Sequence, residues 1–513
     1  MDSRSIASLL EQVEGLRAHH VPSAATPSRL IADSREAGPG TLFIATRGMR
    51  SDAHDYVPQV IEAGAAGVLV AQDWLQSSPV GGPAAFAERH PNVALLSYSG
   101  GPETLGLVAA AWYSEPSSEL TLVGITGTNG KTTVATLCDD AARTLGLRSA
   151  RIGTTGVYLD GKSISEASHT TPNALALQAT LRQLADAGCE YVFAEVSSHA
   201  LVQQRTAACR FAGGVFTNIS HDHLDYHGDM LSYIEAKKLL FDQLPASAFA
   251  LVNADDKRGE VMLQNTRAKR LSYALRRPAD YKARLLDESV RGLHLQIDQH
   301  EVHTRLAGRF NAYNLLAAYG VLVQLDHEPE DVLRALSELR GAAGRLEPVG
   351  IPGVETLGLV DYAHTPDALE NVLTTLQGER RAGHQVITVV GCGGDRDRTK
   401  RPLMGKIAAK LSDRVIVTDD NPRTEPAQDI RRAVLSELSV EERARTLELG
   451  NRREAIRAAV ALAHHRDVIL VAGKGHERYQ EVDGVRHDFD DVAVLRSALQ
   501  EKAGAPTQND AST

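Results

Sequence analysis

The sequence predicts an α/β protein built from three domains. The chain has 513 residues, and at roughly 150 residues per domain about three domains are expected. Short apolar runs that end in polar residues alternate with helical patterns along the chain. A glycine-rich loop, GTNGK, lies between one such run and a helical pattern. Strands that alternate with helices indicate parallel sheets, and the loop indicates a P-loop-type mononucleotide-binding domain in the middle.

Composition excludes several classes of protein. The formal net charge is −10, whereas nucleic-acid binders usually carry a basic face. The four cysteines are few for such a long chain and form no C-x-x-C pair, which is typical of a reducing cytoplasm. The N-terminus is charged and lacks a signal-peptide core, and no apolar run approaches the roughly 20 residues of a membrane span. We therefore expect a cytoplasmic protein, a monomer, without nucleic-acid or membrane partners.

The first hundred residues predict a small α/β domain, assigned to residues 1–100. RLIADS, TLFIAT, GVLVA and NVALLSYS are typical of strands, and YVPQVIEAGAA of a helix between two of them. GGPETLG then begins a connecting helix.

The middle domain is assigned to residues 101–346. LTLVGIT predicts a strand and TTVATLCDDAARTLG a helix with one apolar face, with the loop between them. CEYVFAEVS, GGVFTNIS and AFALVNADD predict later strands, and NAYNLLAAYGVLVQL a helix near the end of the domain. Ligands bind at the carboxyl ends of such parallel strands, so the polar residues there are candidates as a group.

The third domain is assigned to residues 347–501 and predicts a second doubly wound, Rossmann-like sheet. ETLGLVDY, QVITVVGC, DRVIVTDD and DVILVAGKG predict its strands, with helices at PLMGKIAAKL, DIRRAVLSEL and RREAIRAAVALAHH. The polar segment 502–513 predicts a flexible tail.

The loop after LTLVGIT has the residues that hold a nucleotide phosphate. Backbone N–H groups of Gly127 to Thr133 can face phosphate oxygens at a helix N-terminus. Lys131 can reach the β- and γ-phosphates, and the Thr132 hydroxyl can hold Mg²⁺. The alternative is an ordinary glycine turn, but the flanking strand and helix favour nucleotide binding.

Three further segments of the middle domain carry candidate groups. Glu195 ends a strand, where a carboxylate can bind Mg²⁺ or simply face solvent. TNISHDHLDYHGD packs histidines and aspartates closely, as a metal site or a hydrated surface loop would. Lys237 shares a predicted helix face with Tyr233 and Leu240; a lysine there is more commonly one that snorkels to the surface.

Strand ends of the third domain combine cationic and anionic groups. Arg396 and Arg423 can each grip a carboxylate through a planar guanidinium fork. Glu477 can accept an ammonium group. A carboxylate clamp with an ammonium acceptor is what an amino-acid pocket requires. The alternative is structural, since Asp-Asn-Pro forms good turns and arginine is common in solvated loops.

Ten segments together resemble the Mur ligases, and among them the members that add diaminopimelate. They are GTNGKTT, TTP, EVSSH, NISHDHLDYH, EAKKLLF, GRLEPV, DYAHTPDAL, DDNPRTEP and GKGHE in this order, preceded by ADSR at residue 32. The resemblance covers nearly the whole chain. It implies three domains: the first for the UDP end of the substrate, the second for ATP and the third for an incoming amino acid. One departure is Ala53, which stands where the family has glycine.

The resemblance also implies roles for individual residues. Catalysis would involve Lys131, Glu195, His223 and Lys237. ATP would be bound by Gly127, Thr128, Asn129, Gly130, Lys131, Thr132, Thr133, Asn314 and Arg345. The UDP-MurNAc-dipeptide would be bound by Ala32, Ser34, Thr170, Thr171, Ser197, Gln203 and Arg205. meso-Diaminopimelate would be bound by Arg396, Asp420, Asn421, Pro422, Arg423, Gly473 and Glu477.

Two Mg²⁺ ions are implied as cofactors, on Thr132, Glu195, His223 and a Lys237 carbamylated by CO₂. The implied reaction joins meso-diaminopimelate to the D-glutamate of UDP-MurNAc-L-Ala-D-Glu through an acyl phosphate made from ATP, in peptidoglycan precursor synthesis. An arginine at position 423 favours diaminopimelate over L-lysine, because lysine has no second carboxylate. Alternatives are the same ligase using L-lysine, a folylpolyglutamate synthetase-like enzyme, a non-catalytic protein of this fold, and a simple P-loop ATPase or kinase.

Overall fold

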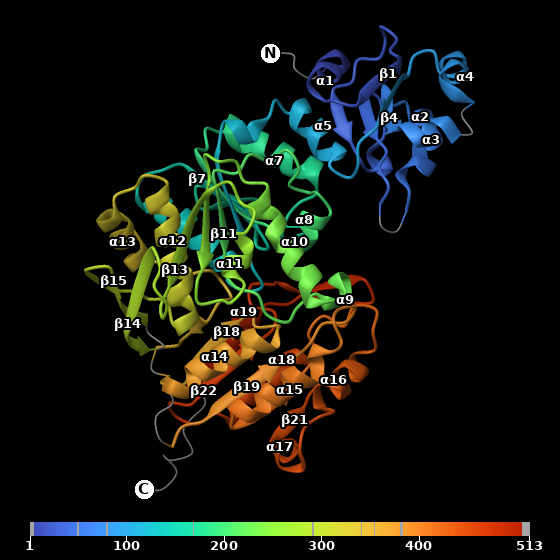
Figure 1. The fold of residues 1–513 in the computed structure, drawn as a ribbon. Helices are drawn as coiled ribbons and strands as arrows, with labels where there is room; N and C mark the ends of the chain where they lie inside the picture. The colour runs from blue at the N-terminus through green and yellow to red at the C-terminus, as the bar shows by residue number, and fades with distance from the viewer. Residues whose placement is uncertain are drawn as a thin grey trace, which may run out of the picture.

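The protein folds into three α/β domains arranged in order along the chain, each built on its own sheet, which confirms the predicted fold class (Figure 1). The computed structural model describes residues 5–48, 51–77, 81–167, 169–289, 292–339, 341–352, 354–379 and 383–504. In the described part of the chain no helix is long and apolar enough to cross a membrane.

The first domain holds a five-stranded sheet of order β1-β5-β4-β3-β2, in which only β1 runs antiparallel to its neighbour. Its strands are β1 (Leu16–His20), β2 (Arg29–Ile31), β3 (Thr41–Ile44), β4 (Gly67–Ala71) and β5 (Ala94–Tyr98). Its helices are α1 (Ile6–Gln12), α2 (Val57–Glu62), α3 (Gln72–Ser77), α4 (Gly82–Arg89) and α5 (Thr104–Trp112), with short 3₁₀ helices at Ser34–Glu36 and Ala53–Tyr56. Apolar residues of α1 and α5 cover one face of the sheet, and those of α2, α3 and α4 cover the other.

The middle domain holds an eleven-stranded sheet of order β16-β15-β14-β13-β12-β11-β6-β10-β7-β8-β9. Its strands are β6 (Thr121–Thr126), β7 (Ser149–Gly153), β8 (Gly156–Leu159), β9 (Lys162–Ser165), β10 (Tyr191–Glu195), β11 (Gly213–Phe216), β12 (Phe249–Asn253), β13 (Lys269–Ala274), β14 (Tyr281–Ser289), β15 (Gly292–Ile297) and β16 (His300–His303). Its helices are α6 (Lys131–Thr144), α7 (Ala174–Asp186), α8 (Ser198–Val202), α9 (Leu224–His227), α10 (Met230–Asp242), α11 (Gly259–Met262), α12 (Arg309–Gln324) and α13 (Pro329–Glu338).

The centre of this sheet is parallel, and its carboxyl ends position the candidate site. β6 lies between β10 and β11 and pairs with both in parallel. Helices α6 and α12 bury their apolar residues on one face, and α7 and α10 on the other. A sheet covered on both faces leaves its strand ends as the place where polar side chains from several strands meet.

The third domain holds a six-stranded sheet of order β17-β18-β22-β19-β20-β21, parallel except for β17, and a separate hairpin of β23 and β24. Its strands are β17 (Glu347–Val349), β18 (Leu357–Asp361), β19 (Val386–Val390), β20 (Arg414–Val417), β21 (Thr446–Glu448), β22 (Val468–Ala472), β23 (Tyr479–Val482) and β24 (Val485–Asp488). Its helices are α14 (Pro366–Glu379), α15 (Lys400–Leu411), α16 (Ala427–Leu435), α17 (Val440–Ala444), α18 (Arg452–Leu462) and α19 (Asp491–Gly504).

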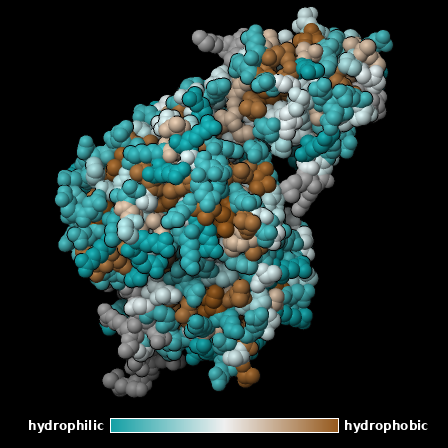
Figure 2. All heavy atoms as spheres, viewed as in Figure 1, coloured by the Kyte–Doolittle hydropathy of each residue, from teal (hydrophilic) through white to brown (hydrophobic). Residues whose placement is uncertain are grey.

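The C-terminal helix is longer than the sequence predicts. Residues 502–504, expected in a flexible tail, continue α19, and Lys502 Nζ donates to the carbonyl oxygens of Val460 and Ala463. The rest of the predicted tail, residues 505–513, lies outside the described residues. On the face seen in Figure 2, hydrophilic residues predominate and hydrophobic residues are interspersed among them.

Candidate functional site

One large cavity is lined by residues of all three domains. Its volume is about 1440 Å³. Arg47 and Gly48 of the first domain lie on its wall, as do Lys131 and Arg205 of the second and Tyr362 of the third. A site of this kind can bring together substrates that are bound by different domains.

The glycine-rich loop folds as predicted between β6 and α6. Gly130 has a φ of +89° and directly precedes α6, and a Cβ on it would lie 2.5 Å from Asn314 Oδ1. A Cβ on Gly127 would lie 1.9 Å from Thr217 Oγ1. Both positions therefore require glycine, because any side chain would collide with a neighbouring strand or helix. Of the predicted ATP residues, Thr128, Asn129, Gly130, Lys131, Thr132 and Arg345 line the cavity.

Lys131 folds back onto its own loop. Its Nζ donates to the carbonyl oxygens of Gly127 at 2.8 Å and Thr128 at 2.9 Å. Burial lowers the pKa of Lys131, while the carboxylates of Glu195 and Asp222 act in the opposite direction. The amine lies where phosphate oxygens bound by this loop would meet it.

Glu195 ends β10, next to the loop, and is 1 % exposed. Its Oε2 accepts from Thr132 Oγ1 at 2.9 Å and from Thr154 Oγ1 at 3.2 Å, and its Oε1 accepts from Thr154 N–H at 2.9 Å. Within the described residues, no ion pair with Glu195 is found. A buried carboxylate beside a threonine hydroxyl is a suitable donor set for Mg²⁺, which prefers oxygen ligands. These two residues therefore fit the predicted metal site.

Lys237 is buried inside the middle domain, not extended to its surface. Its side chain is on α10 and is 1 % exposed, and Tyr233 and Leu240 of the same helix are also buried. Lys237 Nζ donates to Gly127 O at 2.9 Å and lies 4.5 Å from the centroid of the Tyr233 ring. Burial lowers the pKa of Lys237 well below its ordinary value, and the nearby charge of Lys131 lowers it further. The snorkelling alternative is thus wrong for this residue.

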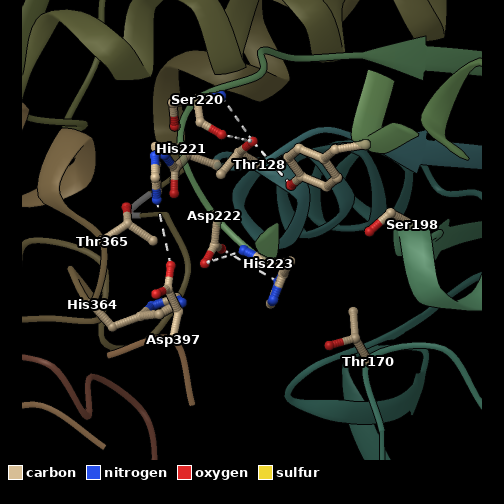
Figure 3. Close-up of polar contacts among 12 residues, drawn as sticks. Thr128, Thr170, Ser198, Ser220, His221, Asp222, His223, His364, Thr365 and Asp397 are labelled. Atoms are coloured by element: carbon tan, nitrogen blue, oxygen red, sulfur yellow. Dashed lines mark hydrogen bonds and ion pairs between the residues drawn. The ribbon is translucent and has the colours of Figure 1, made fainter. Parts of the chain in front are cut away.

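The segment after β11 turns toward the third domain at His223. This residue has a φ of +55°, and its Nε2 lies 3.3 Å from Asp222 Oδ2. Burial lowers the pKa of His223 to about 3. A neutral imidazole is the form that binds metals. In Figure 3 the side chains of His223 and Asp222 lie side by side, with His364 and Asp397 across from Asp222.

The second and third domains meet around the loop through specific polar contacts. Asn129 Nδ2 donates to Asp367 Oδ2 at 3.0 Å. His221 Nε2 lies 3.5 Å from Asp397 Oδ2, a contact visible in Figure 3. Arg345 stacks over the Tyr362 ring at 4.6 Å, and its Nη2 donates to Thr132 Oγ1 at 3.3 Å. Asn314, the other predicted ATP residue outside the loop, is buried beneath it and donates to Asn311 Oδ1.

The predicted dipeptide-binding residues form one hydrogen-bonded group. Arg205 Nη1 donates to Thr171 O at 2.8 Å, and its Nε and Nη2 donate to Gln203 Oε1. The Thr171 hydroxyl donates to Glu195 O and accepts from Ser197 N–H. Residues of this group on the cavity wall are Thr170, Ser197, Gln203 and Arg205.

The predicted first-domain residues lie away from this cavity. Ala32 follows β2 and packs against the core of the first sheet, and Ser34 begins a 3₁₀ helix whose N-cap is Asp33. The first-domain residues on the cavity wall include Arg47 and Gly48, which the sequence did not single out.

Ala53, the departure from the family pattern, begins another 3₁₀ helix of the first domain. Asp52 caps that helix by accepting from His54 N–H, and the buried His54 accepts from Ala71 N–H through Nε2 at 2.9 Å. Ala53 is absent from the residues with positive φ, so an alanine is accommodated there without backbone strain.

The predicted amino-acid pocket assembles at the strand ends of the third domain. Of the predicted residues, Arg396, Asp420, Asn421, Arg423, Gly473 and Glu477 line the cavity. Arg423 Nη1 donates to Gly394 O at 2.7 Å, and Arg423 Nε lies 3.8 Å from Glu481 Oε2. Asn421 Nδ2 donates to Glu477 Oε2 at 2.8 Å. A Cβ on Gly394 would lie 1.9 Å from the carbonyl oxygen of Pro422, so the backbone of this segment packs against a glycine.

Comparisons with known proteins agree with this geometry. The family description "Mur ligase middle domain" matches residues 125–322, and "Mur ligase, glutamate ligase domain" matches residues 344–475. A Bacteroides fragilis protein named UDP-N-acetylmuramoyl-L-alanyl-D-glutamate--2,6-diaminopimelate ligase is 47% identical over 464 residues, covering 90% of this chain and 93% of the relative. The chain belongs to the Mur ligase family.

Solved structures place this Mur ligase among the same relatives. A structure of a UDP-N-acetylmuramoyl-L-alanyl-D-glutamate--2,6-diaminopimelate ligase shares 34% identity and a TM-score of 0.63, covering 93% of this chain and 96% of that one. A folylpolyglutamate synthase of Mycobacterium tuberculosis, complexed with ADP and AMPPCP, has a TM-score of 0.61 at 18% identity. It covers 79% of this Mur ligase and 96% of its own chain, and it shows a shared fold only.

Several cavity residues of this Mur ligase were not predicted to be functional. Lys400 begins α15, and its Nζ lies 3.9 Å from Asp222 Oδ1, across the domain boundary. His364 and Tyr362 follow β18 on the cavity wall, and burial lowers the pKa of His364 to about 4. All three lie in segments at predicted strand ends, DYAHTPDAL and GCGGDRDRTKRP, but only domain packing brings Lys400 to Asp222.

Proposed function

We propose that this Mur ligase joins meso-diaminopimelate to the D-glutamate of UDP-MurNAc-L-Ala-D-Glu in peptidoglycan precursor synthesis. The chain is an ATP-using ligase of the Mur family. The observation that carries the proposal is the shared cavity, in which the phosphate loop and the Arg423–Asn421–Glu477 group face one space. Two relatives that are 47% identical to this chain bear the name of this activity, which supports the same assignment.

The reaction has two steps. The D-glutamyl carboxylate attacks the γ-phosphorus of ATP, and ADP leaves, which gives an acyl phosphate. The amine of the amino acid then attacks the acyl carbon, loses a proton, and displaces phosphate. Lys131, held at the loop, would offset the negative charge that moves between the phosphate oxygens. An ionised carboxylate does not react readily with an amine because it lacks a good leaving group. Phosphorylation supplies that leaving group as phosphate.

Mg²⁺ would be held by Thr132, Glu195 and His223, with Lys237 as a carbamate. The hydroxyl and the carboxylate lie 2.9 Å apart, and the imidazole of His223 is neutral, so the donor set suits the ion. In carbamylation the Lys237 amine forms a bond to the carbon of CO₂ and releases a proton. The product is an anion on a side chain whose amine donates to Gly127 O and lies over the Tyr233 ring. Two bound Mg²⁺ ions would supply charge stabilisation of the phosphoryl group.

The muramoyl dipeptide would lie against the Thr171, Ser197, Gln203 and Arg205 group, with Thr170 beside it. Arg205 is half-buried and makes no ion pair within the described residues, so its guanidinium offers charge to a substrate carboxylate. The uridine end would reach the first domain near Ala32 and Ser34.

The third domain would select the amino acid. Arg423 and Arg396 would bind the far carboxylate of diaminopimelate, and Glu477 its far ammonium, with Asp420, Asn421, Pro422 and Gly473 shaping the pocket. L-Lysine offers no such carboxylate, so it would leave a guanidinium without an anion. On this basis residues 1–100 bind the UDP end, residues 101–346 bind ATP and catalyse the reaction, and residues 347–501 bind the amino acid.

The test is amine-dependent phosphate release. The purified protein is supplied with ATP, Mg²⁺, bicarbonate and UDP-MurNAc-L-Ala-D-Glu, and then with meso-diaminopimelate, LL-diaminopimelate, L-lysine or L-ornithine. Release with meso-diaminopimelate alone is expected. Release with L-lysine instead would keep the ligase and overturn the assignment of the amino acid. Absence of release with every amine would overturn the proposed function.

A further inference from the structure

A buried lysine lies directly behind the amino-acid pocket. Lys474 follows β22 between two glycines, and it is 0% exposed. Its Nζ donates to Asn421 Oδ1 at 2.8 Å and to Glu477 Oε2 at 3.1 Å, and lies 3.9 Å from Asp420 Oδ1. All three partners of Lys474 are on the cavity wall, while Lys474 is not among the residues that line it. Its charge therefore acts on the pocket through these residues.

The contact with Lys474 fixes the orientation of the Asn421 amide. Asn421 Oδ1 accepts from Lys474 Nζ and also from Glu481 N–H at 2.9 Å. Both neighbours on this side of Asn421 are donors, so its side-chain oxygen must face them. A flipped amide would place its NH₂ group against both donors. The Asn421 NH₂ must then point the other way, where it donates to Glu477 Oε2 at 2.8 Å.

These contacts give the two carboxylate oxygens of Glu477 different hydrogen-bonding environments. Oε2 accepts from both Lys474 and Asn421. In the part of the chain that the structure describes, no hydrogen bond to Oε1 is found. Glu477 is on the cavity wall, so Oε1 is the oxygen available to a ligand.

Around Lys474 and Glu477, carboxylates outnumber the cations that face them. Arg452 forms a buried pair with Asp491 at 2.7 Å, and Arg423 faces Glu481. Lys474 lies beside two carboxylates, those of Asp420 and Glu477, and Asp420 Oδ2 is also 4.0 Å from Arg452 Nη1. Buried carboxylates need a compensating positive charge, which a substrate ammonium can provide.

We infer that Lys474 is a positioning residue of the amino-acid pocket. It locks the Asn421 amide and one oxygen of Glu477, so that Glu477 presents its other oxygen to the far ammonium of the incoming amino acid. The inference rests on the proposed function. Lys474 touches no substrate, and its effect is confined to how the amino acid binds.

The experiment measures steady-state constants for Lys474→Met in the full-length protein. The KM for meso-diaminopimelate is expected to rise at least about tenfold, because hydrogen bonds to charged groups belong to the stronger class. The KM values for ATP and for UDP-MurNAc-L-Ala-D-Glu should stay within about twofold, since Lys474 contacts neither binding region. Lys502→Met is the matched control: the same substitution in the same domain, on a lysine that donates only to backbone carbonyls.

A second variant separates positioning from a general loss of structure. In a Glu477→Gln background, Lys474→Met should raise the KM for diaminopimelate by less than about twofold, because the two residues act as one unit. Equal factors in both backgrounds would overturn the inference, as would an unchanged KM in the single variant. If Lys474→Met does not fold, Lys474→Gln, which is shorter and uncharged and so cannot make both contacts as lysine does, replaces it, and an unchanged KM in that variant would also overturn the inference. A wild-type protein inactive with diaminopimelate would instead refute the proposed function.

Discussion

The amines of Lys131 and Lys237 donate to the same carbonyl oxygen, that of Gly127, at 2.8 and 2.9 Å. Lys131 comes from α6, the helix that follows the phosphate loop, and Lys237 from α10, so side chains of two helices converge on one backbone atom. Each lysine lies in the electrostatic field of the other, and burial already disfavours charge on both. The loop and α10 are therefore linked through one backbone oxygen.

Lys237→Ala should abolish ligase activity. The carbamate proposed at this position would be lost, and high bicarbonate should not restore it, since alanine has no amine to modify. A loss of at least about a hundredfold in kcat is expected, at the upper end of effects for groups around a metal. Lys238→Ala is the control, because this neighbour on the same helix pairs with Asp242 instead. Normal turnover by Lys237→Ala would refute the carbamate role.

Arg423→Ala should weaken the use of diaminopimelate far more than the use of ATP. The guanidinium donates from Nη1 to Gly394 O, and its Nε lies 3.8 Å from Glu481 Oε2, which leaves Nη2 to donate to a ligand carboxylate. We expect the KM for diaminopimelate to rise more than about tenfold, with little change in the KM for ATP. Arg398→Ala, an exposed arginine that pairs with Glu425, serves as the control. Equal losses for both substrates would show that Arg423 is structural.

Asp367→Ala should weaken ATP binding from the other side of the domain boundary. Asp367 Oδ2 accepts from Asn129 Nδ2, and Asn129 belongs to the phosphate loop. Loss of this bond should raise the KM for ATP about fivefold, the scale of one ordinary hydrogen bond. Asp367→Asn retains an acceptor oxygen and should change the KM by less than about twofold. Identical values for the two variants would contradict the role of this contact.

Acid should remove a contribution to stability made by Glu425. The Arg401 guanidinium, which binds both its oxygens, holds the pKa of Glu425 at about 2, below its ordinary value of 4.5. Because the folded-state pKa is the lower one, the contribution is complete above about pH 4.5 and is lost as the pH falls toward 2. Denaturant unfolding of wild type and Glu425→Gln should therefore differ most at pH 6 to 7 and converge near pH 2. A difference that does not change with pH would contradict this.

The sequence predicted those parts of the site that depend on local structure. The Gly127–Thr133 loop and the strand-end positions of Glu195 and Glu477 follow from a strand, a turn and a helix in sequence order. Residue spacing alone did not show whether the Lys237 side chain is buried or exposed. Spacing identifies the face of the helix on which a lysine lies, but not whether other elements pack over that face. Only the resemblance favoured an inward position, and burial in the structure agrees with it.

Other features depend on contacts between distant parts of the chain. Lys400 meets Asp222, and Lys474 meets Asn421, only after two domains or two strand ends pack together. The antiparallel extensions β8–β9 and β15–β16 were not predicted either. β9 is exposed along its length and carries no apolar alternation, so its existence depends on pairing with β8. β15 does alternate buried and half-buried residues, a sequence signal that the prediction missed.

The hydrogen bond between Asn129 and Asp367 joins residues 238 positions apart in the chain. Because the two residues belong to one chain, the chain that joins them sets the effective concentration at which this contact forms, and the protein concentration does not. Diluting the protein should therefore leave the contact between the second and third domains unchanged.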